Sequence, residues 1–333
     1  MAALRIETRL TRLVGIDLPI IQAGMSWASS GSELPLAVSR AGGLGVIAAG
    51  PMYRDDLARA IDEVKAGTDR PFAVNVPLYR KGIEEILELL EERRVPVLIA
   101  SQGGPRKYLD RFKRIGTVCL HVVASEEHAR KAADAGVDGL IVVGGEAGGH
   151  PPAELVSTLV IGRAVARAVP DTPIVLSGGI ADGYGLAAAL ALGADAAQLG
   201  TRFMLTPEAR LHAAYRERVR QAGIADTMVV GRGFGVVRVL RNGFAETMIE
   251  AELSAQPEDG RRDLFQRATL KLAAFDGDVE AGKVEAGQSA GLCSEILPAA
   301  EIVLRIAEDY LAATQRLPRA TAASSPKDLQ HVG

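Results

Sequence analysis

The chain has 333 residues, 48% hydrophobic and 24% charged, which suffices for one large domain or two medium ones. A net charge of −3 and an aromatic content of 4% argue against nucleic acid or an anionic membrane surface as partner. No segment reaches membrane-spanning length without charges, and residues 1–12 contain no apolar signal core. Two cysteines, Cys119 and Cys293, make no disulfide framework. We therefore expect a globular cytoplasmic protein without a membrane partner.

Short apolar runs alternate with helical stretches along the first 200 residues. The runs that read as strands are 19–24, 44–49, 72–76, 95–100, 117–123, 140–143, 174–176 and 196–201. Between them, apolar residues recur at helical spacing, and Ser125 and Asp182 read as helix caps. Connections this short imply parallel strands joined by right-handed crossovers. Eight repeats, with no Gly-x-Gly-x-x-Gly after the first strand, favour a closed (β/α)8 TIM barrel over an open doubly wound sheet.

The alternation stops after Phe203. Residues 206–286 contain helical stretches, predicted over 208–222 and 262–275, and an apolar helix over 296–311 then fits as the eighth helix. We therefore expect a barrel domain made of residues 1–205 and 287–313. Residues 206–286 would form a small helical lid inserted between strand eight and its helix, above the face where barrel enzymes keep their active sites. Residues 314–333 are polar and are predicted to form a disordered tail.

The sixth strand runs into a glycine-rich loop that ends in a histidine, Gly144-Gly145-Glu146-Ala147-Gly148-Gly149-His150. Glycines let the backbone approach a ligand closely, and such a loop after a strand is where α/β proteins bind a phosphate or a flat cofactor. A plain glycine-rich turn is the alternative. His150 is the candidate general base, because a histidine titrates near neutral pH and this one lies at the barrel mouth. His121 follows an apolar strand and reads as a core histidine.

Other strand ends supply candidate binding groups. Ser177-Gly178-Gly179 and Gly200-Thr201 suit a phosphate cup, because loops after strands seven and eight often form one from bare N–H groups and a hydroxyl. Asn75 and Gln198 are amides suited to the donor and acceptor edge of a flavin ring, with plain strand-end hydrogen bonding as the alternative. No His, Cys, Asp and Glu cluster has metal-ligand spacing, and no Gly-x-Ser-x-Gly elbow occurs, so neither a metal nor serine hydrolysis is expected.

Five ordered motifs together resemble the nitronate monooxygenase family, formerly called 2-nitropropane dioxygenases. They are Ile21-Gln22-Ala23-Gly24-Met25, Phe72-Ala73-Val74-Asn75-Val76, Gly145-Glu146-Ala147-Gly148-Gly149-His150, Ser177-Gly178-Gly179-Ile180-Ala181-Asp182-Gly183 and Gln198-Leu199-Gly200-Thr201-Arg202-Phe203. Residues 287–292 resemble the family's C-terminal motif. The resemblance runs through residues 10–310 and implies an FMN-binding TIM barrel that oxidises alkyl nitronates, or nitroalkanes, with O₂.

The resemblance also assigns individual residues. It places FMN contacts on Ala23, Gly24, Met25, Asn75, Gly148, Gly178, Gly179, Gln198, Leu199, Gly200 and Thr201. Ser177 joins them from its place in the phosphate loop, and the catalytic histidine maps onto His150. Many members carry a glutamine where this chain has Val143. Residues 22–27 and 151–154 look closer to flavin NADH:quinone reductases of the same superfamily, and residues 282–292 look like FMN-dependent enoyl-acyl carrier protein reductases.

Three functional hypotheses stay open at this point. The first is nitronate oxidation by FMN and O₂, with His150 as the base when the substrate is a neutral nitroalkane. The second is an FMN reductase that uses NAD(P)H and acts on a quinone or an enoyl thioester. The third is a barrel that binds FMN or another ligand without catalysis. The sequence predicts neither the physiological substrate nor the oligomeric state.

Overall fold

The computed structural model describes residues 4–233 and 235–318. Its centre is a sheet of eight parallel strands, β1 (Ile20–Gln22), β2 (Gly45–Ala48), β3 (Phe72–Pro77), β4 (Val97–Ser101), β5 (Val118–Val123), β6 (Gly139–Val143), β7 (Ile174–Ser177) and β8 (Ala196–Leu199). They pair in the order β1-β8-β7-β6-β5-β4-β3-β2, and a bridge from Ile21 to Leu44 joins β1 to the start of β2. The sheet is thus a nearly closed barrel, and the predicted TIM-barrel fold is confirmed.

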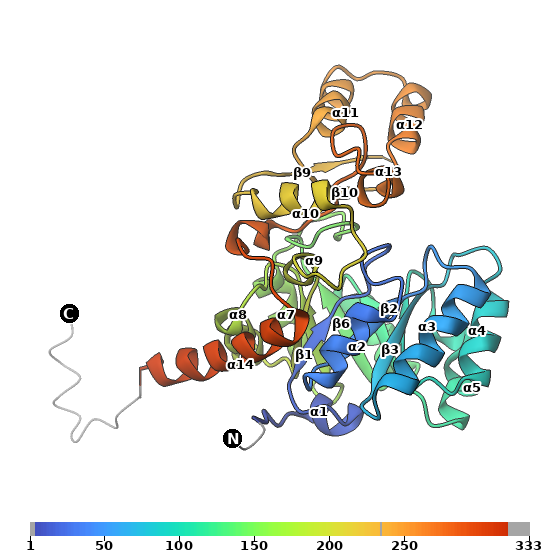
Figure 1. Cartoon of the computed structure of the whole chain (residues 1–333), viewed down its shortest axis with the longest axis vertical. Coiled ribbons are helices and arrows are strands. Elements are labelled where there is room, and N and C mark those ends of the chain that lie inside the picture. The colour runs from blue at the N-terminus through green and yellow to red at the C-terminus, as the bar shows by residue number, and fades with distance from the viewer. Residues whose placement is uncertain (1–3, 234, 319–333) are drawn as a thin grey trace, which may run out of the picture.

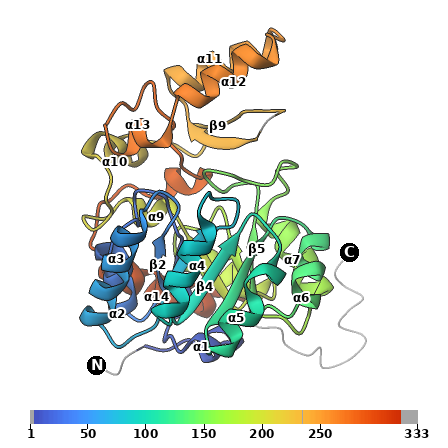
Figure 2. The ribbon, with the colours of Figure 1, turned by 90° about the vertical axis from the view of Figure 1, so that its right-hand side faces the viewer.

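Helices surround this barrel on the outside (Figures 1 and 2). They are α2 (Glu33–Arg40), α3 (Arg54–Gly67), α4 (Ile83–Glu92), α5 (Leu109–Arg114), α6 (Glu126–Asp134), α7 (Thr158–Ala168), α8 (Gly183–Ala191) and α14 (Ala299–Arg316). Ser125 and Asp182 cap α6 and α8, as the sequence predicts. The last helix, α14, packs against both α8 and α2, so it completes the ring. No described helix is long and apolar enough to cross a membrane.

Alternate residues of each strand point into the barrel and form its inner core. Ile21, Val46, Ala73 and their counterparts on the other strands belong to this cluster, while their sequence neighbours pack against the surrounding helices. A short helix ahead of the barrel, α1 (Arg9–Val14), adds Leu10 to the inner core. The barrel interior is therefore filled at the amino-terminal ends of its strands, which leaves the carboxyl ends for a site.

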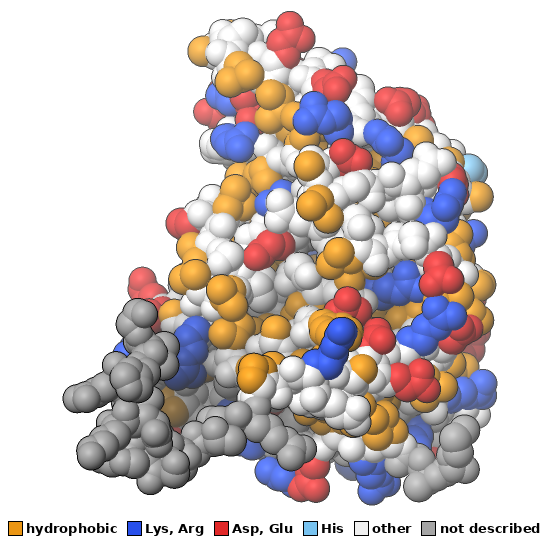
Figure 3. Space-filling model, turned by 90° about the vertical axis from the view of Figure 1, so that its left-hand side faces the viewer, with side chains coloured by type: hydrophobic (Ala, Val, Ile, Leu, Met, Phe, Trp, Pro, Cys, Tyr) orange, Lys and Arg blue, Asp and Glu red, His pale blue; other side chains and the backbone are white. Residues whose placement is uncertain are grey.

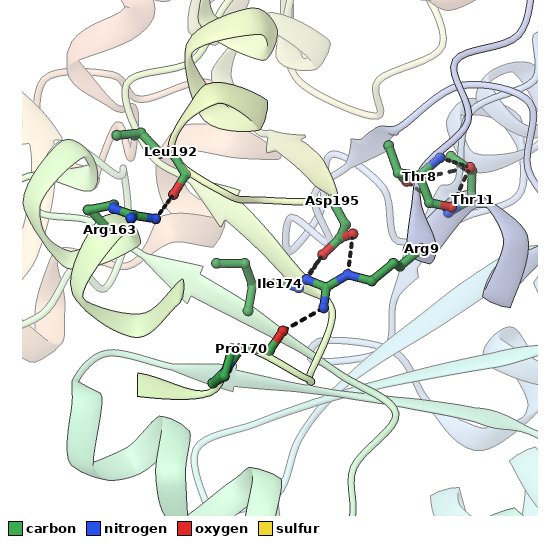
Figure 4. Close-up of polar contacts among 8 residues, drawn as sticks. All are labelled: Thr8, Arg9, Thr11, Arg163, Pro170, Ile174, Leu192 and Asp195. Atoms are coloured by element: carbon green, nitrogen blue, oxygen red, sulfur yellow. Dashed lines mark hydrogen bonds and ion pairs between the residues drawn. The ribbon is translucent and has the colours of Figure 1, made fainter. Parts of the chain in front are cut away.

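Polar contacts fasten α1 to this filled end of the barrel (Figure 4). The Arg9 guanidinium donates to both carboxylate oxygens of Asp195, at 2.9 and 2.8 Å, and to the carbonyl of Pro170 at 2.6 Å. Asp195 also accepts the backbone N–H of Ile174 at 3.0 Å. One buried carboxylate thus joins α1 to β7 and to the start of β8.

The seam between β1 and β2 is closed by a side chain as well as by backbone. Gln22 is fully buried, and its amide oxygen accepts the N–H of Val46 at 2.9 Å while its amide nitrogen donates to the Val46 carbonyl at 3.2 Å. A side-chain amide carries the same donor and acceptor as a peptide group. The Gln22 side chain therefore takes the place of a peptide group and bonds the end of β1 to the backbone of β2.

Residues 206–286 lie above the carboxyl ends of the strands (Figures 1 and 2). Their elements are α10 (Ala213–Arg220), β9 (Thr227–Val230), β10 (Val237–Leu240), α11 (Gly243–Leu253), α12 (Glu258–Arg267) and α13 (Leu270–Ala274). β9 and β10 pair as an antiparallel hairpin, and Val230, Val239, Phe244 and Met248 form a separate small core.

The structure corrects the sequence predictions in four places. The inserted segment is not purely helical, because the valine-rich runs on either side of Gly231 pair as β9 and β10. The helix predicted over 208–222 is confined to α10. The helix predicted over 262–275 is two helices, because Thr269 adopts an extended backbone and caps α13. Residues 314–316, predicted to belong to a disordered tail, form the end of α14, and residues 319–333 of that predicted tail lie outside the described part.

Candidate active site

A cavity of about 1600 Å³ opens where the carboxyl ends of the barrel strands face the inserted segment. The predicted site residues that line it are Ala23, Gly24, Met25, Asn75, Gly148, His150, Ser177, Gly178, Gly179, Gln198, Gly200 and Thr201. They come from the ends of five strands or the loops that follow them, between residues 23 and 201. The barrel therefore brings together all but one of the residues predicted from the sequence.

The exception is Leu199, which the alternation of the strand explains. On β8, Ala196 faces the inner core, so Gln198 two residues later points to the barrel mouth and Leu199 points to the helices. Leu199 is 1% exposed and does not line the cavity. Its backbone carbonyl accepts the N–H of Ala23 at 2.9 Å, so only its main chain supports the neighbouring loop. The same alternation turns Val143 of β6 toward the mouth.

Two glycines at the cavity are required by close packing of the protein itself. A Cβ on Gly24 would lie 2.6 Å from the Cβ of Asn75. A Cβ on Gly148 would lie 2.5 Å from backbone atoms of Ala286 and Gly287. Residues 148 and 286–287 thus touch through main chain alone, which fixes the glycine-rich loop against the segment that leads into α14.

The loop after β7 has the features of an anion cradle. Gly178 and Gly179 have φ values of +114° and +70°, in the region that favours glycine. Within the described part of the chain, neither of their N–H groups has a hydrogen-bond partner. Across from them, the buried Thr201 hydroxyl accepts the N–H of Gly287 at 2.9 Å, which leaves its own hydrogen free to donate. Three donors therefore remain for an anionic ligand.

The side-chain amides of Asn75 and Gln198, at the mouth of the barrel, each donate a hydrogen bond within the protein through the amide nitrogen. Asn75 donates to the carbonyl of Ile99 at 3.1 Å, and Gln198 donates to the Ser177 hydroxyl at 3.2 Å. The amide oxygen of each accepts no hydrogen bond from any described residue. Strand-end bonding therefore orients both side chains, and their oxygens stay available to a ligand with N–H groups.

His150 is exposed to the cavity at the end of the glycine-rich loop. The inserted segment holds this loop in place. Gly149 and Arg238 of β10 exchange two backbone hydrogen bonds, at 3.1 and 2.7 Å. The buried Arg238 side chain then donates twice to the carbonyl of Gly145, at 3.2 and 2.7 Å, and once to the Thr227 hydroxyl at 2.8 Å. The position of His150 thus depends on the β9–β10 hairpin.

Glu285 and Lys283 are among the charged residues that line the cavity and were not singled out from the sequence. Glu285 lies near His150 and Lys283. Burial raises the pKa of the Glu285 carboxyl, and positive charge on either neighbour opposes that shift. Burial lowers the pKa of the Lys283 ammonium, which lies 3.4 Å from the ring centroid of Phe265. Both fall within residues 282–292, the segment whose resemblance to enoyl reductases was the only sequence signal for them.

His121 is nearly buried, as its place after an apolar run suggests, and lies at the wall of the cavity. It is 5% exposed, and its Nδ1 lies 2.9 Å from the hydroxyl of Tyr108. Burial lowers the pKa of His121, so the neutral ring is favoured. Among the described residues, no group of three or more His, Cys, Asp and Glu side chains is placed to hold a metal.

The model of the family described as "Nitronate monooxygenase" matches residues 7–89 and 79–309. The chain belongs to the nitronate monooxygenase family.

Individual relatives within this family bear different names. The chain is 33% identical to a nitronate monooxygenase of Pseudomonas aeruginosa, over 90% of the chain and 98% of that protein. It is 34% identical to a (3aS,4S,5R,7aS)-5-hydroxy-7a-methyl-1-oxo-octahydro-1H-indene-4-carboxyl-CoA dehydrogenase of Mycobacterium tuberculosis, over 92% of the chain and 97% of that protein. A solved structure of FabK from Thermotoga maritima superposes with a TM-score of 0.87 at 40% identity, covering 93% and 98% of the two chains. The chain is accordingly a flavin-dependent oxidoreductase, and the names of its relatives leave more than one reaction open.

Proposed function

We propose that this protein is an FMN-dependent oxidoreductase that oxidises or reduces a large thioester next to its carbonyl group. The observation that carries the proposal is the size of the cavity. At about 1600 Å³ it exceeds the roughly 300–1,000 Å³ of a pocket for one small ligand. It therefore has room for a flavin together with a second large molecule, whereas an alkyl nitronate is small.

The residues of the cavity fit FMN. The unpaired N–H groups of Gly178 and Gly179 and the Thr201 hydroxyl would hold its phosphate, without any lysine. The amide oxygens of Asn75 and Gln198 would accept from the N–H groups of the flavin ring. At Gly24 and Gly148 any side chain would collide with the protein. Without side chains at these two positions, the backbone can approach the flavin closely. When bound, FMN supplies the acceptor or donor of a hydride.

His150 would move the proton of this reaction. It is exposed to the cavity, and the backbone bridge at Gly149 fixes where its ring can reach. A histidine at this place takes a proton from the carbon beside the thioester carbonyl during oxidation, or returns one during reduction. The Glu285 carboxylate, when ionised, favours the cationic ring that has just gained a proton. We also propose that residues 206–286 are the lid that excludes water from this step.

Oxidation of alkyl nitronates with O₂ is the second candidate. It is favoured by the match of the family model over residues 7–309 and by the nitronate monooxygenase of Pseudomonas aeruginosa. The chemistry is related, because a nitro group, like a thioester carbonyl, acidifies the neighbouring carbon. The same base and the same flavin site would serve both reactions.

One anaerobic experiment separates these candidates. The flavin-loaded protein is mixed in turn with a panel of acyl-CoA and enoyl-CoA thioesters, an alkyl nitronate, NADH and NADPH, and the flavin absorbance is followed. We expect reduction by an acyl-CoA, or by a reduced nicotinamide followed by reoxidation with an enoyl-CoA. Reduction by the nitronate alone would replace the thioester proposal with nitronate oxidation. No response to any compound would favour a ligand-binding barrel without catalysis.

A further inference from the structure

The walls of the cavity are much more basic than the chain as a whole. The protein has 38 Lys and Arg against 41 Asp and Glu. The Lys and Arg side chains that line the cavity are Arg80, Lys81, Lys131, Lys271 and Lys283, whereas Glu285 supplies its one acidic side chain among the described residues. A concave surface of one charge concentrates ligands of the opposite charge.

The loop between β3 and α4 contributes the first part of this charge. Tyr79 lines the cavity and is 72% exposed, and Lys81 nearby is exposed as well. The Arg80 guanidinium donates to the carbonyls of Ala49 and Met52, which hold the loop without neutralising the charge. In the described ranges, neither Arg80 nor Lys81 has a carboxylate partner.

The neighbouring loop, between β4 and α5, adds two more cations. Residues 102–105 line the cavity, and the exposed Arg106 and Lys107 follow at once in the short helix η1 (Pro105–Lys107). The two loops lie side by side, since Leu78 donates to the Ser101 carbonyl at 2.8 Å. No described acidic residue pairs with Arg106 or Lys107. By contrast, the nearby Arg111 is engaged by Glu84 and Glu91.

We call Tyr79, Arg80, Lys81, Arg106 and Lys107 the basic rim. It is separate from the phosphate cup at Gly178, Gly179 and Thr201, because β3 and β4 lie across the barrel from β7 and β8 in the strand order. A flavin phosphate held at the cup therefore leaves these cations without an anion. An exposed tyrosine ring beside several unpaired cations suits a nucleotide, whose base stacks on the ring while its phosphates meet the charges.

We propose that the basic rim binds the adenosine bisphosphate end of a nucleotide-bearing co-substrate. The inference rests on the proposed function, which requires a thioester carrier, a nicotinamide nucleotide or both. Two sources share this chemistry: coenzyme A carries its additional phosphate on the 3′ position of the ribose, and NADPH carries it on the 2′ position. The rest of either molecule extends from the rim toward His150 and the flavin site.

Calorimetric titration of the flavin-loaded protein tests the proposal with two probes, adenosine 3′,5′-bisphosphate and adenosine 2′,5′-bisphosphate. The test variant reverses three charges, Lys81→Glu, Arg106→Glu and Lys107→Glu. Since three attractive contacts with the phosphates become repulsive, we expect affinity to fall about tenfold or more. Tyr79→Ala should also weaken binding without altering charge. Arg114→Glu is the control, because Arg114 is the last residue of α5 and does not line the cavity.

Tighter binding of the 3′ probe identifies coenzyme A as the source, and tighter binding of the 2′ probe identifies NADPH. Failure of both probes to bind, or equal affinity for wild type and both rim variants, overturns the proposal. Because this binding requires no turnover, it is independent of the redox test. A protein that binds a probe at the rim but shows no flavin reduction by thioesters would lose the proposed function and keep the basic rim.

Discussion

At the scale of single residues, His150 and Glu285 carry the proposed chemistry, and they reach the cavity from segments 135 positions apart in the chain. His150 follows two glycines whose backbone is fixed by contacts with the protein, whereas Glu285 precedes the Ala286–Gly287 backbone that touches Gly148. A glycine-rich loop before a histidine is visible in a sequence. The opposing Glu285 carboxylate is not visible in this way, because it is brought near by tertiary contacts: the packing of residues 286–287 onto Gly148 and the bridge from Glu285 to Val239.

Replacing His150 with alanine should remove proton transfer and leave flavin binding nearly unchanged. General-base catalysis contributes about 10²–10⁴-fold, so kcat/KM for a substrate that must lose a proton should fall by that factor. A neutral nitroalkane and its anionic nitronate make a matched pair for the measurement, because only the former still holds the proton. Equal losses for both would mean that His150 binds or orients the substrate instead of acting as the base.

We predict that the Glu285 carboxyl makes the stability of the protein depend on pH in a specific way. Its pKa in the folded protein is raised above the ordinary value of 4.5 by burial. The folded state therefore binds this proton more tightly, so its contribution to stability is present below pH 4.5 and is lost as pH rises through the raised pKa. Glu285→Gln should remove that loss and be more stable than wild type near neutral pH.

Urea unfolding of both proteins, measured in steps from pH 4 to pH 8, gives the difference curve for this carboxyl. The other titrating groups are common to both proteins and largely cancel in the difference. We expect the variant to gain stability relative to wild type as pH rises. A flat difference curve would show that Glu285 is as well solvated in the folded protein as in the unfolded chain.

At the scale of elements, the hairpin of β9 and β10 is the part of the structure that the sequence did not reveal. Its strands have four residues each and are valine-rich without a clear alternation of polar and apolar positions, so they resemble other short apolar runs. The barrel strands were predictable because each is an apolar run bounded by helical stretches and repeated eight times. No comparable repeat marks the hairpin, although the Arg238 side chain of β10 reaches the glycine-rich loop at Gly145.

Arg238→Ala should loosen the glycine-rich loop. The variant loses two charged donors to the Gly145 carbonyl and one to Thr227, and hydrogen bonds to charged groups are worth about 1.5–3 kcal/mol. We expect about 2 kcal/mol less stability and faster amide hydrogen exchange over residues 145–150. Arg241→Ala is the control, because Arg241 follows β10 and its side chain is 54% exposed. Unchanged exchange in Arg238→Ala would mean that the loop holds its shape without the hairpin.

At the scale of the whole molecule, the barrel fold can be predicted from the number of strands. Its closure depends on long-range polar contacts, and these cannot be predicted from the sequence. Asp195 joins α1 to two strands, and nothing local to Asp195 indicates its partner 186 residues earlier.

The face on which α8 and α14 lie shows hydrophobic side chains interspersed with charged ones (Figure 3). On α14, Leu304 is 51% exposed, next to Arg305, which pairs with Glu295 and Glu301. Scattered leucines of this kind are ordinary for a protein surface.

Asp195→Ala should therefore destabilise the whole barrel. The change leaves the Ile174 N–H without its acceptor and removes the partner of Arg9, whose side chain is 41% exposed. We expect a loss of about 2–3 kcal/mol, measured by urea unfolding of the flavin-loaded protein. Glu7→Ala is the matched control, because the Glu7–Arg12 pair is exposed on both sides and should contribute less than about 1 kcal/mol. Equal effects would show that Asp195 has no special place in barrel closure.

The proposed chemistry depends on which cofactor binds at the mouth of the barrel. The most direct measurement is to denature the purified protein, release the cofactor and identify it by chromatography and mass. We predict one non-covalent FMN for each chain, because Gly178, Gly179 and Thr201 provide donors for a single terminal phosphate at the cup. Release of FAD, or no flavin even after reconstitution with FMN, would contradict the central claim.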